Sequence, residues 1–185
     1  MNIIKTPIPG LLIIEPQVFR DERGYFIESY NQQKLLEAGI QTVFVQDNES
    51  KSVRGTIRGL HYQLDPHSQT KLVRVITGAV FDVAVDLRKG SPTFGQWYGI
   101  ELTEENKIQF YIPQGFAHGF SVLSETAVFA YKCDRIYNPG AERGICYNDP
   151  SLQIDWRISE KEAIVSNKDL KHPLFIKAEI NFSFQ

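Results

Sequence analysis

The stretch Phe81–Arg88, which reads Phe-Asp-Val-Ala-Val-Asp-Leu-Arg, alternates strictly between two kinds of side chain. One set is large and apolar and consists of Phe81, Val83, Val85 and Leu87. The other set is small or charged and consists of Asp82, Ala84, Asp86 and Arg88. Because successive side chains of a strand point to opposite faces of a sheet, this period of two predicts a β-strand. An acid such as Asp82 on the second face indicates a polar barrel interior, the kind that holds ligands.

Two further stretches have the same period. Lys71–Thr77 places Lys71, Val73 and Val75 on one face, and Gly78 is expected to turn the chain into the next strand. Ala127–Cys133 places Phe129, Tyr131 and Cys133 together. No repeat, low-complexity tract or linker-like segment interrupts residues 1–185. We therefore expect a single all-β domain, a sandwich or barrel of many short strands.

Helical signals are few and short. Asn31 is a suitable N-cap for a helix over Gln32–Ala38, with Gly39 as its C-terminal stop. Ser159 is followed three residues later by Glu162, a capping-box pattern that predicts a helix over Glu160–Val165. Both helices are expected at the periphery of the barrel.

Composition narrows the class of protein. Hydrophobic residues make up 42% of the 185 residues and charged residues 23%, which excludes disorder as the main state. A net charge of −2 argues against nucleic-acid binding through bulk charge. No apolar run is long enough for a membrane helix, and Leu11–Ile14 is too short for a signal peptide. Cys133 and Cys146 are too few for a disulfide framework, so we expect a cytoplasmic protein.

Two motifs match the halves of the cupin pattern, which describes a small double-stranded β-helix, or jelly-roll, barrel. The first runs from Gly55 to His61, and the second is Pro113-x-Gly-x-x-His118. Cupins usually bind a metal through His-x-His, a nearby Glu and a later His, but Gln63 replaces the second His here. We therefore predict no metal, although a three-histidine site of His61, His67 and His118 stays open as an alternative.

Four segments together resemble the dTDP-4-dehydrorhamnose 3,5-epimerase family. They are Arg58-Gly-Leu-His61-Tyr-Gln63, Lys71-Leu-Val, Gln114-Gly-Phe-Ala-His118-Gly-Phe and Ser166-Asn-Lys-Asp169. The resemblance runs from Thr6 to about Asp169, in the family's order and spacing. Tyr147 and Arg157 depart from it, because many members have Trp and Pro there, and both look peripheral to the chemistry.

The resemblance implies inversion of carbons next to the ketone of a dTDP-linked 4-keto-6-deoxyhexose. Such a reaction needs a base on one face of the sugar, a stabiliser for the enolate and an acid on the opposite face. His61 suits the base, since imidazole titrates near neutral pH. The family assigns Asp169 to orient it, Lys71 to the enolate oxygen and Tyr131 to the acid. No metal or redox cofactor is required.

The resemblance also implies a set of substrate-binding residues and a homodimer. Arg23 and Arg58 would bind the diphosphate, since guanidinium groups match phosphate oxygens. Phe19 would stack on thymine. The remaining contacts to base or sugar would come from Glu28, Gln46, Asn48, Asp82 and His118. The apolar segment Leu11–Ile14 could add to a partner's sheet edge.

Each residue also has an ordinary structural explanation. Arg23 could form a surface salt bridge with the acids before it, Phe19 could belong to the core, and Asp82 could be a buried acid paired with an arginine. At the level of function, three alternatives remain. They are a single-carbon epimerase on a related sugar nucleotide, a metal-dependent cupin oxygenase and a non-catalytic sugar-binding cupin.

Overall fold

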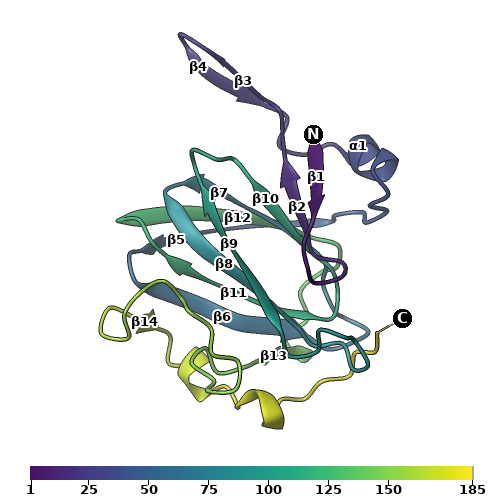
Figure 1. Cartoon of the computed structure of the whole chain (residues 1–185), viewed down its shortest axis with the longest axis vertical. Coiled ribbons are helices and arrows are strands. Elements are labelled where there is room, and N and C mark those ends of the chain that lie inside the picture. The colour runs from purple at the N-terminus through teal and green to yellow at the C-terminus, as the bar shows by residue number, and fades with distance from the viewer. Residues whose placement is uncertain (185) are drawn as a thin grey trace.

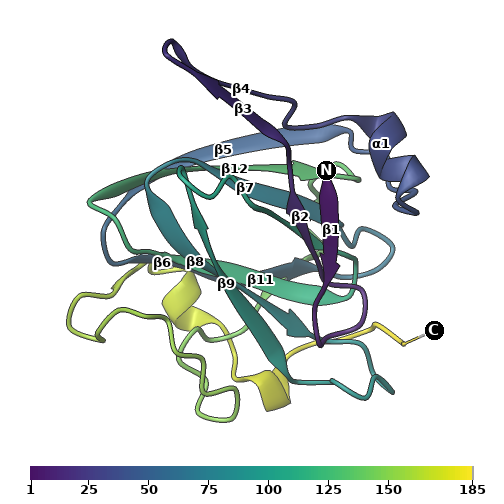
Figure 2. The ribbon, with the colours of Figure 1, turned by 45° about the horizontal axis from the view of Figure 1, so that its top comes forward.

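The computed structural model describes residues 1–184 and contains two antiparallel sheets that face each other (Figures 1 and 2). The first sheet has the strand order β1-β2-β10-β7-β12-β5. Its strands are β1 (Asn2–Lys5), β2 (Leu12–Glu15), β10 (Gln109–Ile112), β7 (Lys71–Thr77), β12 (Thr126–Cys133) and β5 (Gln46–Val53).

The second sheet has the order β13-β6-β11-β8-β9, and a short strand, β14, pairs in parallel with β6. Its strands are β13 (Glu142–Gly144), β6 (Thr56–Gln63), β11 (Phe116–Val122), β8 (Ala79–Asp86), β9 (Trp97–Thr103) and β14 (Ile164–Val165). Two facing antiparallel sheets with these crossovers form a jelly-roll barrel, which confirms the predicted fold class. None of the helices within residues 1–184 is long and apolar enough to cross a membrane.

The alternating stretch is strand β8, which begins and ends two residues earlier than predicted. Its apolar face, with Val83 and Val85, belongs to a cluster between the second sheet and the C-terminal segments. Its other face points into the barrel, where Ala84 packs in the core between the two sheets. Val73 and Phe129 come to this core from β7 and β12, so all three predicted strands have the predicted faces. Asp82 is fully buried on the inner face, as a polar interior requires.

Helix α1 (Gln32–Glu37) lies against the outer face of the first sheet and confirms the first helix prediction. The Asn31 side chain accepts a hydrogen bond from the backbone N–H of Lys34, which caps the helix. Gly39 adopts a φ of 86°, a conformation that glycine reaches without strain, and it ends the helix.

The second helix prediction is wrong. Only half of the capping box forms: the backbone N–H of Ser159 donates to Glu162 Oε2 at 3.3 Å, but the Ser159 hydroxyl also donates to this oxygen, at 2.8 Å, and does not accept from the Glu162 N–H. The chain then leaves the turn, because the backbone N–H of Ile164 donates to Gly55 O and Ile164–Val165 joins β6 as β14. Pairing with an existing strand replaces the helix after one turn. The other helical elements are short 3-10 turns, η1 (Asp169–Lys171) and η2 (Phe175–Lys177).

The N-terminal segment corrects a second expectation. Leu12–Glu15 pairs with β1 on one side and β10 on the other, so it is not a free edge for a partner. What extends from the barrel instead is the hairpin of β3 (Val18–Asp21) and β4 (Gly24–Ile27), which projects away from both sheets (Figures 1 and 2). The aromatic side chains of Phe19 and Phe26 on this hairpin are 53% and 69% exposed.

Two glycines of the sequence motifs allow β6 and β11 to approach closely. A Cβ on Gly59 would lie 2.5 Å from the Cα of Gly119, and a Cβ on Gly119 would lie 2.7 Å from Arg58 O. Neither position therefore accepts a side chain without moving backbone. The approach places His61 directly opposite His118 in the register of the two strands.

Candidate active site

A cleft opens between the two sheets where β6 and β11 face β7 and β12. Its lining includes His61, Lys71, His118, Tyr131, Tyr137 and Glu142. Four of these six were predicted from the sequence. The cleft therefore gathers side chains that lie as far as 81 positions apart in the chain into one polar cavity.

His61 is oriented by Asp169. The Nε2 of His61 lies 2.8 Å from Oδ1 of Asp169, whose side chain is only 5% exposed. Burial opposes ionisation of this carboxyl, but the hydrogen bond and charge of His61 and the backbone N–H of Gly59 outweigh it, so the pKa of Asp169 lies below its ordinary value. A carboxylate accepts the Nε2 proton, which leaves Nδ1 as the His61 nitrogen that can accept another.

His118 and Asp82 form a second pair deeper in the barrel. Nε2 of His118 lies 2.9 and 3.0 Å from the two carboxylate oxygens of Asp82. Burial lowers the pKa of His118 and raises that of Asp82. Asp82 is thus paired with a histidine rather than with the arginine that the sequence left open, and His118 lines the cleft while Asp82 lies fully buried behind it.

Lys71 and Tyr131 come from the opposite sheet. The Nζ of Lys71 lies 5.7 Å from the centre of the Tyr131 ring. Burial lowers the pKa of Lys71, while the neighbouring charges of Cys133, Asp82 and Glu142 act in the other direction. Burial raises the pKa of Tyr131, so its hydroxyl keeps its proton at neutral pH. A proton-accepting imidazole and a protonated phenol therefore face the same cleft from different sheets.

Gln46 and Asn48 lie on β5 and Arg58 lies on β6, and none of the three lines the cleft itself. The amide of Gln46 donates to Asn48 Oδ1 at 3.0 Å, and Asn48 lies opposite Tyr131 in the strand register. Nε of Arg58 donates to Ser52 Oγ at 3.0 Å, which holds the guanidinium against β5. Gln46 is joined to the cleft lining through its Oε1, which accepts from the backbone N–H of Tyr137 at 3.0 Å.

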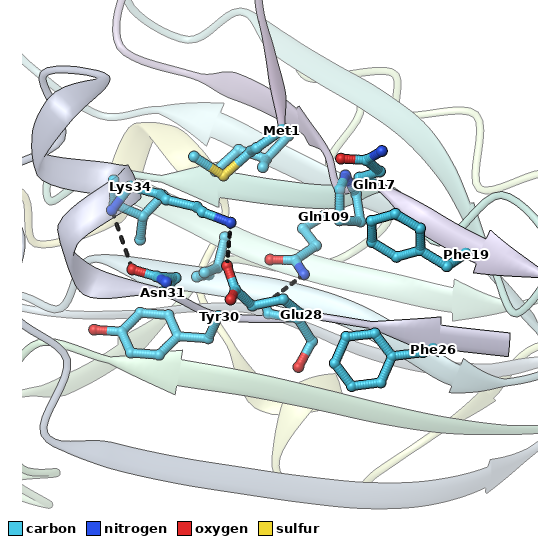
Figure 3. Close-up of a pocket in the computed structure, with 14 residues that line it drawn as sticks. Met1, Gln17, Phe19, Phe26, Glu28, Tyr30, Asn31, Lys34 and Gln109 are labelled. Carbon is cyan, nitrogen blue, oxygen red and sulfur yellow. Dashed lines mark hydrogen bonds and ion pairs between the residues drawn. The ribbon is translucent and has the colours of Figure 1, made fainter.

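Phe19, Arg23 and Glu28 do not join the cleft of their own chain. Phe19 and Glu28 line a separate pocket near α1, where Glu28 forms an ion pair with Lys34 at 2.8 Å (Figure 3). Arg23 lies at the hairpin tip, 85% exposed at its side chain, and pairs with Asp21. Within residues 1–184, these three residues lie apart from His61 and its partners.

The sequence alone missed four residues around His61. Tyr137 donates to Glu142 Oε2 at 2.6 Å, and Lys168 forms an ion pair with the same oxygen at 2.6 Å. His172 lies edge-on to His61, with ring centres 5.5 Å apart. Lys168 stands in the Ser166–Asp169 motif without a predicted role, and the other three residues stand outside the four motifs. Lys168 and His172 flank Asp169 in the sequence, and this proximity was the one available signal.

The three-histidine metal site does not form among residues 1–184. Each of its members has another partner, since His61 bonds Asp169, His118 bonds Asp82, and Nε2 of His67 lies 3.0 Å from the Asn138 amide. The one group of potential ligands that gathers within these residues is His61, Asp169 and His172.

A jelly-roll barrel with a polar cleft between its sheets places the chain in the cupin class. The dTDP-4-dehydrorhamnose 3,5-epimerase family model matches residues 5–177, nearly the whole barrel and its C-terminal segments. The chain therefore belongs to the dTDP-4-dehydrorhamnose 3,5-epimerase family, as the four sequence motifs suggested.

Named relatives agree with this assignment. A dTDP-4-dehydrorhamnose 3,5-epimerase of Shigella flexneri is 54% identical over 97% of this chain and 98% of its own. The dTDP-6-deoxy-D-glucose-3,5-epimerase of Legionella pneumophila, solved in complex with dTDP-4-keto-L-rhamnose, is 53% identical with a TM-score of 0.94, covering 100% of this chain and 98% of the other. A 3'-monoepimerase of Streptomyces bikiniensis, solved with dTDP-quinovose, is 33% identical with a TM-score of 0.86, covering 91% and 85%.

Proposed function

We propose that the chain converts dTDP-4-keto-6-deoxy-D-glucose to dTDP-4-keto-L-rhamnose by inverting C3 and C5. The observation that carries the proposal is the placement of His61 and Tyr131 on opposite sheets across one cleft. A base and an acid on two sides of a sugar are what inversion requires, because the proton must leave one face and return to the other.

The proton path follows from the contacts of each group. Nδ1 of His61 takes the proton next to the ketone, and the imidazolium that forms is stabilised by the Asp169 carboxylate 2.8 Å from Nε2. The Lys71 ammonium stabilises the negative charge on the enolate oxygen. The Tyr131 hydroxyl then donates its proton to the opposite face of the same carbon. The residues need no metal or redox cofactor for this sequence.

A single-carbon epimerase is the second candidate, since the chain also resembles a 3'-monoepimerase. Proton NMR of the product from dTDP-4-keto-6-deoxyglucose in deuterium oxide separates the two. Deuterium at both C3 and C5, with the coupling constants of the L-rhamno configuration, supports the 3,5-epimerase. Deuterium and inversion at one carbon supports the single-carbon enzyme, and no exchange at either carbon contradicts both.

Arg58→Ala should weaken binding of dTDP by about 10- to 100-fold, the usual scale for lost hydrogen bonds to a charged group. The diphosphate carries the same charge in the ground and transition states, so turnover should fall less than affinity. Isothermal titration with dTDP and steady-state kinetics measure the two effects.

Arg54→Ala is a matched control, because the Arg54 guanidinium donates to Leu123 O and stands at the β5–β6 turn. It should bind dTDP as the unmodified chain does. Unchanged affinity in Arg58→Ala would remove that residue from the nucleotide site.

We further propose a cytoplasmic homodimer in which the β3–β4 hairpin of one copy reaches the cleft of the other. The hairpin projects from its own barrel and exposes Phe19 and Phe26, while Arg23 carries a charge suited to a diphosphate (Figure 2). Both cysteines are free thiols, as a reducing compartment favours.

A mixing experiment tests this arrangement. His61→Ala lacks the base, and Arg23→Ala should bind substrate weakly. A mixed dimer would contain one cleft with an intact His61 and an intact partner Arg23, so mixing should restore activity at low substrate concentration. Activity equal to the sum of the separate variants, after subunit exchange is verified, would assign Arg23 to its own chain or to no site.

A further inference from the structure

The side chains of His61, Asp169 and His172 meet at one point beside the cleft. One ligand atom from each lies within 4.8 Å of the other two. Asp169 and His172 come from the same 3-10 turn, in which the backbone N–H of His172 donates to Asp169 O at 3.2 Å. Residues three apart in such a turn lie on the same side, so the turn presents both side chains to His61.

Gly144 makes room for this arrangement. A Cβ at Gly144 would lie 2.2–2.5 Å from three atoms of the His172 ring, so the imidazole packs flush against the strand backbone. Gly144 is the β13 residue directly opposite His61 in the register with β6. The second imidazole is thereby held next to the first by backbone, and no other residue at position 144 would leave the space.

His172 has an unused donor or acceptor. Its Nδ1 is buried and has no hydrogen-bond partner within residues 1–184. A buried polar nitrogen without a partner costs free energy, and a ligand that it could bind would recover that cost.

We propose that His61, Asp169 and His172 bind a borderline divalent transition-metal ion, with Zn²⁺ as the best match. Two imidazole nitrogens and one carboxylate oxygen, with a fourth position open, are a common zinc ligand set. Zn–N distances of about 2.0–2.1 Å and a tetrahedral angle put two imidazole centres about 5 Å apart. The 5.5 Å between the His61 and His172 rings is close to this value.

The surrounding charges permit a cation. Lys168 and Arg143 line the adjacent groove with His172, but Lys168 is paired with Glu142 at 2.6 Å and Arg143 with Glu179 at 2.7 Å. The His61 side chain is 31% exposed, so an ion can enter from the cleft.

The ion would inhibit the enzyme. This consequence rests on the proposed function. A metal on Nε2 of His61 needs the lone pair of that nitrogen, so the single N–H proton of the neutral imidazole, now shared with Asp169, must move to Nδ1. A protonated Nδ1 has no lone pair, so it cannot accept a proton from the sugar. Zinc occupancy and base catalysis therefore exclude each other at His61.

Equilibrium dialysis of metal-free protein against Zn²⁺ measures the site directly, and Co²⁺ absorption reports tetrahedral coordination. We expect one ion per chain. His172→Phe keeps a flat ring beside His61 without a ligand atom, and should weaken Zn²⁺ binding at least about tenfold. Asp169→Asn, which changes no volume, should also weaken it. His67→Phe, which removes an imidazole elsewhere in the chain, is the control and should bind as the unmodified chain does.

Epimerase assays add a separate readout. Zn²⁺ should inhibit the unmodified chain, a chelator should restore its activity, and any activity of His172→Phe should resist the same Zn²⁺ concentration. Full-affinity binding in both His172→Phe and Asp169→Asn, or loss of the site in His67→Phe, would overturn the metal site. One ion bound through His172 in a chain without epimerase activity would retain the site and refute the proposed function instead.

Discussion

His61→Ala should show no incorporation of solvent deuterium into the sugar, and turnover should fall by about 10³- to 10⁴-fold. Removal of a positioned base costs on this scale, because the group that takes the proton from the carbon is lost. The exchange readout is more decisive than turnover, since exchange needs only the first half of the reaction. NMR of the recovered sugar nucleotide in deuterium oxide measures it.

The variant should fold, because the His61 side chain is 31% exposed and borders an open cleft. His67→Ala removes a histidine outside the base–acid pair and should exchange at the normal rate. Exchange at the normal rate in His61→Ala would require a different base.

Tyr131→Phe should separate exchange from inversion. His61 and Asp169 remain in place, so the enolate still forms, and the base can return a solvent-derived proton to the face it came from. Deuterium should therefore enter with retention, while inversion slows by ~10²-fold or more. Product stereochemistry, measured together with deuterium content, gives both rates from one sample.

Tyr111→Phe is the matched control for loss of a hydroxyl. Its oxygen lies 2.8 Å from Thr42 Oγ1, on the outer face of the first sheet, and its removal should leave inversion unchanged. Normal inversion at both carbons in Tyr131→Phe would assign the acid to another residue.

The sequence predicted the barrel well because its strands are amphipathic at a period of two. Phe81–Arg88 could be assigned to a strand with known faces before any partner strand was identified. The Ser159 capping box failed for a complementary reason. Half of the predicted capping box forms, but the following residues pair with β6, and that pairing joins residues 108 positions apart.

The site was predictable only in part. His61 and His118 stand in motifs whose glycines have a clear physical purpose, the close approach of β6 and β11. Asp169 was predicted entirely from resemblance, since no spacing rule connects residues 108 positions apart.

His172 was missed because its position depends on the space beside Gly144, which exists only in the folded chain. The assignment of Phe19, Arg23 and Glu28 to the substrate stays a prediction that requires a second copy.

His61 and Tyr131, the proposed base and acid, belong to different sheets, so under the proposed mechanism the core between the sheets sets the gap that the sugar must fill. Three aromatic rings span this gap beside the cleft. Phe129, two residues before Tyr131, stacks on Phe120 with ring centres 4.2 Å apart and lies 6.0 Å from His118. Under the proposed mechanism we expect this stack to hold His61 and Tyr131 at a fixed separation. A thinner or looser core would leave both proton-handling groups intact and yet let protons return to the face they left, so the enzyme would exchange hydrogen faster than it inverts carbon.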